Sequence, residues 1–278
     1  RLNKKLKSKY PDKKFKKSAN ILHQIRSVKE NQELNCIKKA CNITKKGFDR
    51  ILKFIKPGIF EYNIQAELIH EFINNNSKGF AYEPIIASGK NACILHYTDN
   101  NKLLNPGELI LMDFGAEYNN YASDLTRCVP VNGRFTDRQK EVYKSVLTVM
   151  NEAKKLLKPG VYLSEYEESV GLLMEKELVK LNLLSMNDIR KNSNMPAYKK
   201  YFMHGTSHHL GLDVHDVSDA QQPISEGMVF TCEPGIYIPE EGLGIRLEND
   251  VFITKNGTQD LMEDIIIEAE EIEETMNN

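Results

Sequence analysis

The chain repeats part of itself, and each copy carries an acidic residue at the matching position. The segment NPGELILMDFGAEY at 105–118 aligns with SEGMVFTCEPGIY at 225–237, which pairs Asp113 with Glu233. A Lys-Pro-Gly sequence also occurs twice, once ahead of each segment. Two repeats in the same order predict two related halves that face one another and deliver their acids to a shared interface.

Helical and strand patterns alternate in blocks along the chain. Apolar positions at helical spacing predict a helical region over 26–55. Thr136 and Ser164 each begin an S/T-x-x-E/Q spacing, which predicts a capped helix start at both positions. Strands are predicted at 109–114, 121–131, 228–233 and 245–253. Helices and antiparallel hairpins that alternate in blocks are typical of the α+β class, which is the fold class that we predict.

Each of the two matched acids is followed by a second acid on the next predicted strand. Asp124 comes 11 residues after Asp113, and Glu248 comes 15 residues after Glu233. In a hairpin, such spacings can place paired side chains next to each other on one face. Four carboxylates among apolar neighbours repel one another, and a buried charge needs compensation, so a bound cation is the natural solution. The competing interpretation, in which the acids face solvent at alternating positions, conflicts with their apolar neighbours.

Histidines are concentrated in one short segment. Four of the seven lie within 204–215, in the sequence HGTSHHLGLDVHD. His204 and His208 have the i, i+4 spacing of HExxH zinc proteases, but no Glu stands between them, which argues against that chemistry. One histidine joined to four carboxylates makes an oxygen-rich site suited to Mn²⁺, Fe²⁺ or Co²⁺. Five protein ligands are too many for one catalytic ion with open positions, so the set favours two ions bridged by carboxylates.

Composition argues against several other classes of function. The chain has 278 residues with 37 Lys and Arg against 39 Asp and Glu, and this balance argues against bulk binding of nucleic acid. No apolar run is long enough to predict a membrane-spanning helix. Five cysteines form no CxxC pair, and the lysine-rich start lacks the apolar core of a secretory signal, so we expect reduced thiols and a cytoplasmic protein.

Charge is uneven at the two ends of the chain. Residues 1–17 carry nine basic groups and one acid, whereas 263–274 carry seven acids and no base. We interpret 1–20 as a basic linker, 21–262 as the folded domain and 263–278 as an acidic tail, with both ends solvated. Two other interpretations stay open, a basic binding arm at the start and a partner-docking element at the end.

Five segments together resemble the pita-bread metallopeptidases, the family of aminopeptidase P, prolidase, methionine aminopeptidase and creatinase, and they are most similar to aminopeptidase P. They are ILHYTDN (94–100), LMDFGAEYNNYASDLTR (111–127), HGTSHHLGLDVHD (204–216), TCEPGIY (231–237) and GIRLEND (244–250). The resemblance covers about residues 20–262, in family order. It implies a pita-bread fold with two pseudo-symmetric halves around a curved antiparallel sheet. It also implies that 1–20 is a linker from an N-terminal domain that the chain lacks.

The resemblance assigns roles to individual residues. The metal ligands would be Asp113, Asp124, His208, Glu233 and Glu248, which hold two divalent ions, Mn²⁺ first and Co²⁺, Fe²⁺ or Zn²⁺ as alternatives. The catalytic residues would be Glu233, His96, His215 and His204, and the substrate-binding residues would be His204, Tyr237 and Arg246. Of these, His204 and Tyr237 are expected to form the wall of a proline pocket, and Arg246 to hold the geometry of the ligand carboxylates.

These roles imply a dinuclear Xaa-Pro aminopeptidase, which hydrolyses the peptide bond between an N-terminal residue and a following proline. The expected partners are peptides with proline at the second position, with no nucleic acid and no membrane, and a homo-oligomer is compatible with the family. Two alternatives stay open. One is a Xaa-Pro dipeptidase, or prolidase, which the motifs do not separate cleanly. The other is a non-catalytic protein-binding module, against which the intact ligand set weighs.

Overall fold

The structure is a computed structural model that describes residues 2–190, 195–219 and 221–278. Helices α1 (Leu2–Lys9) and α2 (Ala19–Ser27) come first. The first half then comprises α3 (Asn31–Phe54), α4 (Glu61–Asn74), β1 (Ile85–Ser88), a 3₁₀ turn (Gly89–Cys93), β2 (Leu109–Phe114), β3 (Glu117–Tyr118), β4 (Tyr121–Ala122) and β5 (Leu125–Pro130). The second half comprises α5 (Asp137–Leu156), α6 (Leu163–Lys180), α7 (Met186–Arg190), a 3₁₀ turn (Ala197–Lys200), β6 (Val229–Cys232), β7 (Gly235–Ile238), β8 (Leu243–Arg246), β9 (Asn249–Thr254) and β10 (Gly257–Asp260). The last element is α8 (Ala269–Asn277).

The two halves share one order of elements. In each half two long helices come first, and then two paired strands enclose a short hairpin: β2 and β5 enclose β3–β4, and β6 and β9 enclose β7–β8. The sheets have the orders β1-β2-β5 and β10-β9-β6, and these pairings are antiparallel. An antiparallel bridge between Thr126 and Glu248 joins the two sheets. The α+β class and the two related halves predicted from the repeat are confirmed.

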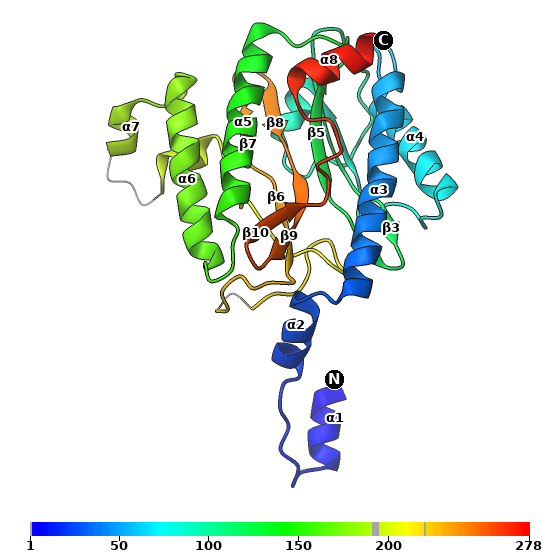
Figure 1. Cartoon of the computed structure of the whole chain (residues 1–278), viewed down its shortest axis with the longest axis vertical. Helices are drawn as coiled ribbons and strands as arrows, with labels where there is room; N and C mark the ends of the chain where they lie inside the picture. Colours follow the sequence, from blue (N-terminus) through cyan, green and yellow to red (C-terminus); the bar gives the residue numbers. More distant parts are fainter. Residues whose placement is uncertain (1, 191–194, 220) are drawn as a thin grey trace.

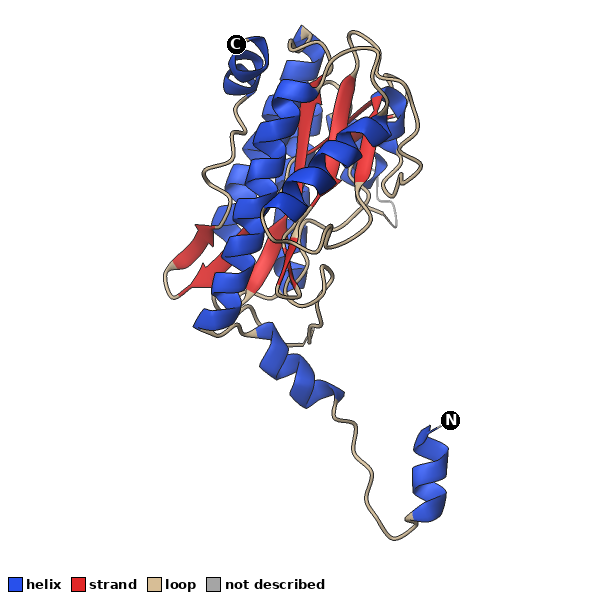
Figure 2. Ribbon diagram, turned by 90° about the vertical axis from the view of Figure 1, so that its right-hand side faces the viewer, coloured by secondary structure: helices blue, strands red, loops and turns tan. Residues whose placement is uncertain are grey.

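The long helices flank the strands. Helix α3 packs against α4, and α5 packs against α6, and Figure 1 shows these two pairs on either side of the strands. Apolar side chains from all these elements form one core, which includes Ile37, Leu68, Val146 and Phe230. Figure 2 shows α1 and α2 extending away from this core. Within the described ranges, no helix combines the length and the apolar character needed to cross a membrane.

The glycines of the repeat lie where a left-handed backbone conformation or a close backbone contact favours glycine. Gly107 and Gly227 precede β2 and β6 with φ values of 83° and 89°, in the left-handed region that glycine enters at no steric cost. Gly115 follows β2, where an added Cβ would lie 1.7 Å from the carbonyl oxygen of Ser123. The matching Gly235 opens β7, where an added Cβ would lie 3.0 Å from the backbone of the neighbouring strand. The sequence repeat therefore reflects the same backbone requirement on both sides of the strand that leads to each acid.

Three predicted segments are interrupted in the structure. One of them is the strand expected over 245–253, which is divided into β8 and β9 with Glu248 in the break. The helical region expected over 26–55 breaks at Val28, which is extended and bridges to Met228, so α2 and α3 are separate helices. The strand expected over 121–131 is divided into β4 and β5, and Asp124 lies in the break. The break at Val28 coincides with a contact to a residue that is remote in sequence, which local periodicity cannot indicate.

One of the two predicted helix starts is correct. Thr136 caps α5, because its hydroxyl accepts from the Gln139 N–H at 3.2 Å while the Gln139 side chain accepts from the Thr136 N–H at 2.9 Å. The start predicted at Ser164 is wrong, because Ser164 already lies inside α6. The carboxylate of Glu167, expected to complete that cap, instead accepts hydrogen bonds from the backbone of Thr206.

The acidic end of the chain packs onto the domain. Helix α8 buries Ala269 and Ile272, and Ile265 ahead of it is also buried. The Glu273 carboxylate accepts a hydrogen bond from the backbone N–H of Phe135 at 2.9 Å. These contacts differ from the solvated terminus expected from charge alone. At the other end, α1 has no buried residue.

Candidate metal centre

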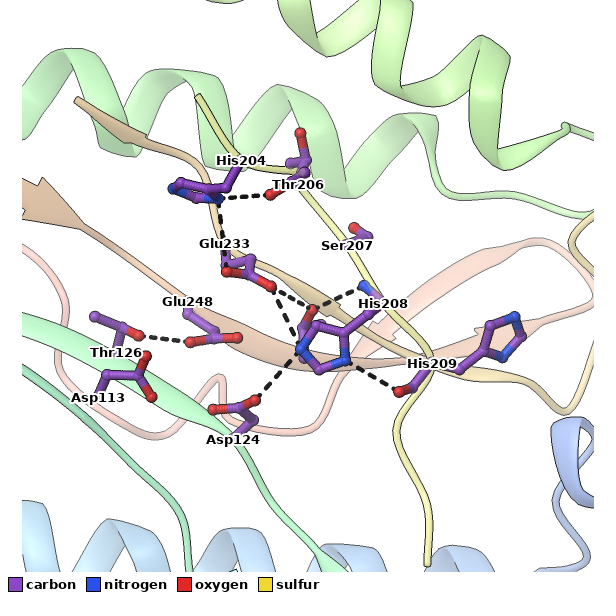
Figure 3. A network of polar contacts seen from close by, with 12 residues as sticks. Asp113, Asp124, Thr126, His204, Thr206, Ser207, His208, His209, Glu233 and Glu248 are labelled. Atoms are coloured by element: carbon purple, nitrogen blue, oxygen red, sulfur yellow. Dashed lines mark hydrogen bonds and ion pairs between the residues drawn. The ribbon is translucent and has the colours of Figure 1, made fainter. Parts of the chain in front are cut away.

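Four carboxylates from the two halves converge on one cavity. Asp113 lies on β2 and Asp124 between β4 and β5, whereas Glu233 directly follows β6 and Glu248 directly precedes β9. The cavity has a volume of about 580 Å³. Figure 3 shows the four carboxylates grouped around His208. We call these five residues the acid–histidine cluster.

Nine of the ten residues singled out in the sequence line this cavity. They are the five residues of the cluster together with His96, His204, His215 and Arg246. The tenth, Tyr237, is fully buried and lies behind the wall rather than in it. The structure therefore brings together residues that lie as far apart in the chain as His96 and Glu248.

His208 is central to the cluster. Its Nε2 lies 3.5 Å from Asp124 Oδ2 and 3.4 Å from Glu233 Oε1. One ligand atom from each of Asp124, His208 and Glu248 lies within 4.8 Å of the others. His208 Nδ1 donates to the backbone carbonyl of His209 at 3.0 Å, because a carbonyl can only accept. In the neutral ring this hydrogen bond directs the Nε2 lone pair at the carboxylates, as in metal-binding histidines.

Three carboxylates of the cluster, Asp113, Glu233 and Glu248, bind protons more tightly than usual. Burial raises the pKa of Glu233 to about 7, although the positive charges of His208 and Arg246 oppose the shift. Burial also raises the pKa of Asp113, against the attraction of Arg246. Burial and then the charge of Asp124 raise the pKa of Glu248 well above its usual value. Negative charge is therefore concentrated where water cannot screen it.

His208 responds in the opposite direction to the same charges. Burial lowers its pKa, but the hydrogen bond to Asp124 and the charges of Glu233 and Asp124 outweigh that effect and raise it to about 9. In the absence of an ion, protons therefore supply the positive charge that this site requires. Carboxylate oxygens with one imidazole nitrogen are a donor set that hard and borderline divalent cations prefer. The cluster fits such an ion on its chemistry.

Two hydroxyl groups that the sequence analysis missed orient these carboxylates. The Tyr82 hydroxyl lies 2.6 Å from Asp113 Oδ1 and also contacts Asp124 Oδ1, and its single proton can serve only one of them at a time. Thr126 Oγ1 donates to Glu248 Oε2 at 2.5 Å. Thr126 could have been found, because the hairpin register places it opposite Asp113. Tyr82 lies in an irregular loop, where no pattern indicates its contacts.

A chain of hydrogen bonds connects Asp113 to His204. Arg246 donates to Asp113 Oδ2 at 2.5 Å and to the Tyr237 hydroxyl oxygen at 2.8 Å. Burial lowers the pKa of His204 to about 3, so its ring is neutral. Its Nδ1 donates to the carbonyl of Gly205 at 2.7 Å, so its Nε2 accepts from the Tyr237 hydroxyl at 2.8 Å. Tyr237 thus contacts Arg246 and His204, which line the cavity, and does not itself line it.

His96 and His215 complete the set of cavity histidines. The His215 ring packs edge-on against His208, with centroids 4.3 Å apart and planes at 85°. Burial lowers the pKa of His215, so its ring is neutral near pH 7 and can donate or accept a hydrogen bond. Both residues line the cavity that holds the cluster.

Glu167 anchors the segment that carries the histidines, and the sequence analysis missed this role. Its carboxylate accepts from the backbone N–H groups of Thr206 at 2.8 Å and Ser207 at 3.2 Å. Burial raises the pKa of Glu167, although these N–H groups favour its charged form. The backbone between Gly205 and His208 is thereby tied to α6.

Comparison with known proteins gives matches over most of the chain. The model of metallopeptidase family M24 matches residues 35–255. The Xaa-Pro aminopeptidase of Escherichia coli (strain K12) is 40% identical over 268 residues, which are 92% of this chain and 60% of that protein. The Xaa-Pro dipeptidase of Pyrococcus horikoshii is 34% identical over 260 residues, which are 92% of this chain and 68% of that protein.

A solved structure shows the same fold. A putative aminopeptidase P from Bacillus anthracis superposes with a TM-score of 0.93 at 36% identity, over 99% of this chain and 64% of that one. This agreement confirms the pita-bread fold that the sequence motifs predict. The chain spans about three fifths of the length of the E. coli and B. anthracis proteins.

Proposed function

Because the chain belongs to metallopeptidase family M24, we propose that it is the catalytic part of a Xaa-Pro aminopeptidase, a hydrolase of the bond between an N-terminal residue and a following proline. The observation that carries this proposal is the meeting of the acid–histidine cluster and three further histidines on one cavity. The E. coli relative, named a Xaa-Pro aminopeptidase, supports the choice of substrate. Membership of a metallopeptidase family implies a divalent metal at the cluster.

We propose two ions held by Asp113, Asp124, His208, Glu233 and Glu248, with Mn²⁺ as the first candidate and Co²⁺, Fe²⁺ or Zn²⁺ as alternatives. Bound divalent ions supply Lewis acidity and make a water molecule acidic enough to lose a proton near neutral pH. Glu233 is suited to accept that proton on a carboxylate oxygen and deliver it to the leaving nitrogen.

The cavity histidines would position the substrate around this proton transfer. His215 and His96 line the cavity and can hydrogen-bond to the carbonyl oxygen as negative charge develops on it. A proline nitrogen carries no N–H in the peptide, so the site must recognise the ring by shape. His204 is fixed by Tyr237 and Gly205 in one tautomer and orientation, and it offers a rigid face for that ring.

Three peptides would test the proposal side by side. Leu-Pro-Ala, Leu-Pro and Leu-Ala-Ala are incubated with the Mn²⁺-loaded chain, and parallel samples contain a chelator. We expect chelator-sensitive release of leucine from Leu-Pro-Ala and no cleavage of Leu-Ala-Ala. Cleavage of Leu-Pro alone would indicate a dipeptidase instead. Failure to cleave any of the peptides with metal bound would contradict the proposed function.

A further inference from the structure

We infer that Glu83 gives this cavity a preference for peptides whose first residue carries a positive side chain, lysine or arginine. The inference rests on the proposed function and names the substrate class of the same site. It comes from the one acidic residue of the cavity wall that does not belong to the cluster.

Glu83 is an unsatisfied charge on the wall of the cavity. Its side chain lines the cavity and the residue is exposed. Among the residues that the structure describes, none forms a hydrogen bond or an ion pair with its carboxylate. The other acids of the wall are Asp113, Asp124, Glu233 and Glu248, whose charges a pair of divalent ions would neutralise. Arg246, the arginine of the wall, is already paired with Asp113.

The position of Glu83 points to the first residue of the peptide. It directly follows Tyr82, whose hydroxyl contacts Asp113 and Asp124. His204 lies 3.8 Å from Glu233. Figure 3 shows His204 and Asp124 on opposite sides of the cluster. With the proline ring against His204, the residue before proline extends past the cluster toward Tyr82 and Glu83.

The surroundings suit a long basic side chain. Ile85 and Leu95 also line the cavity and offer apolar surface to the methylene groups of lysine or arginine. Because Glu83 is exposed, its attraction for a cation is partly screened by water and salt. An exposed pair of this kind changes an equilibrium or a rate by about two- to fivefold. We therefore expect a preference of that size rather than strict selection.

The test compares arginine with citrulline, which has nearly the same shape and no charge. The ratio of kcat/KM for Arg-Pro-Ala to that for Cit-Pro-Ala is measured on the Mn²⁺-loaded native chain and on Glu83→Gln. We expect a ratio of about two to five for the native chain at low salt, and a ratio near one for Glu83→Gln. In 0.5 M NaCl the native ratio should fall toward one, because the exposed pair is screened.

Two controls make the result specific to Glu83 and its position. Glu271→Gln removes an exposed carboxylate on α8, outside the cavity, and should keep the native ratio. The pair Ala-Pro-Arg and Ala-Pro-Cit places the charge at the third position, where Glu83→Gln should change nothing. Cleavage of Cit-Pro-Ala together with an unchanged ratio in Glu83→Gln would overturn the inference and leave the proposed function standing. Absence of cleavage of every peptide would overturn both.

Discussion

Individual side chains of the cluster are oriented by contacts with neighbouring side chains, without the help of a bound ion. Asp124 is contacted by Tyr82 through Oδ1 while its Oδ2 faces His208. One oxygen of Glu248 is held by Thr126. Such contacts hold the carboxylate side chains in one orientation, so that less conformational freedom is lost when an ion binds. The proposed chemistry depends most on Glu233, which has two proposed roles, as a metal ligand and as a proton acceptor.

Replacement of Glu233 by alanine should abolish turnover. The variant loses the carboxylate proposed to bind an ion and to carry the proton, and we expect kcat/KM for Leu-Pro-Ala to fall by at least about a hundredfold. Glu271→Ala, on the exposed side of α8, serves as the control and should keep native activity. Activity of Glu233→Ala within about tenfold of the native value would contradict the assignment.

The affinity for Mn²⁺ should rise with pH between about pH 6 and 8. In the metal-free chain Glu233 has a pKa of about 7 and His208 a pKa of about 9, and an ion must displace a proton from each group that still holds one. Below these pKa values, each displaced proton weakens binding by about tenfold per unit of pH. Calorimetric titrations at three pH values, in buffers of different ionisation enthalpy, give both the affinity and the protons released. A pH-independent affinity without proton release would show that the cluster does not bind the ion through these two groups.

At the scale of the elements, the site is made by strand ends and the tight connections next to them. The acids occupy the next-to-last position of a strand, the break between two strands or the residue beside a strand. Glycine at 115 lets the backbone approach Ser123, and this approach brings the next acid, Asp124, back to the cluster. The repeated glycines are therefore part of how the site is built, although they offer it no functional group.

Substitution of Gly115 by alanine should destabilise the domain strongly. The new Cβ would lie 1.7 Å from the Ser123 carbonyl oxygen, so the backbone must move, and we expect a loss of about 3 kcal/mol or more. Urea denaturation followed by circular dichroism measures the change. Gly205→Ala is the matched control, since an added Cβ there finds its nearest neighbour at 3.7 Å. Equal stability of the two variants would contradict this account of the repeat.

For the whole molecule, the two halves and the chain end form one packed body. The bridge between Thr126 and Glu248 joins the sheets at the cluster itself, so the cluster depends on both halves being folded. The acidic end returns to the domain and fills part of its surface with Ile265, Ala269 and Ile272. Helices α1 and α2 instead extend from the domain, with Arg26 paired to Asp213 and Asp216.

Replacement of Ile272 by alanine should lower the free energy of unfolding of the whole domain by about 3 kcal/mol, because a fully buried side chain leaves a cavity. Differential scanning calorimetry should show one transition at a lower temperature. Glu271→Ala in the same helix, at an exposed position, should leave the transition unchanged. If Ile272→Ala melts like the native chain, the end of the chain does not contribute to the core and a role in docking a partner becomes the better interpretation.

The histidines and Arg246 of the cavity were assigned through the resemblance to the metallopeptidase family. By spacing and repetition, the sequence itself predicted the α+β class, the two related halves and the meeting of the four carboxylates. Their role as ligands stays a prediction. Tertiary structure alone decided what surrounds them: Tyr82 reaches two acids from an irregular loop, and Tyr237 lies behind the wall. The acidic composition of the end of the chain likewise gave no indication that part of it is buried. Periodicity reports which face of an element is apolar, whereas these contacts depend on how elements remote in sequence pack against each other.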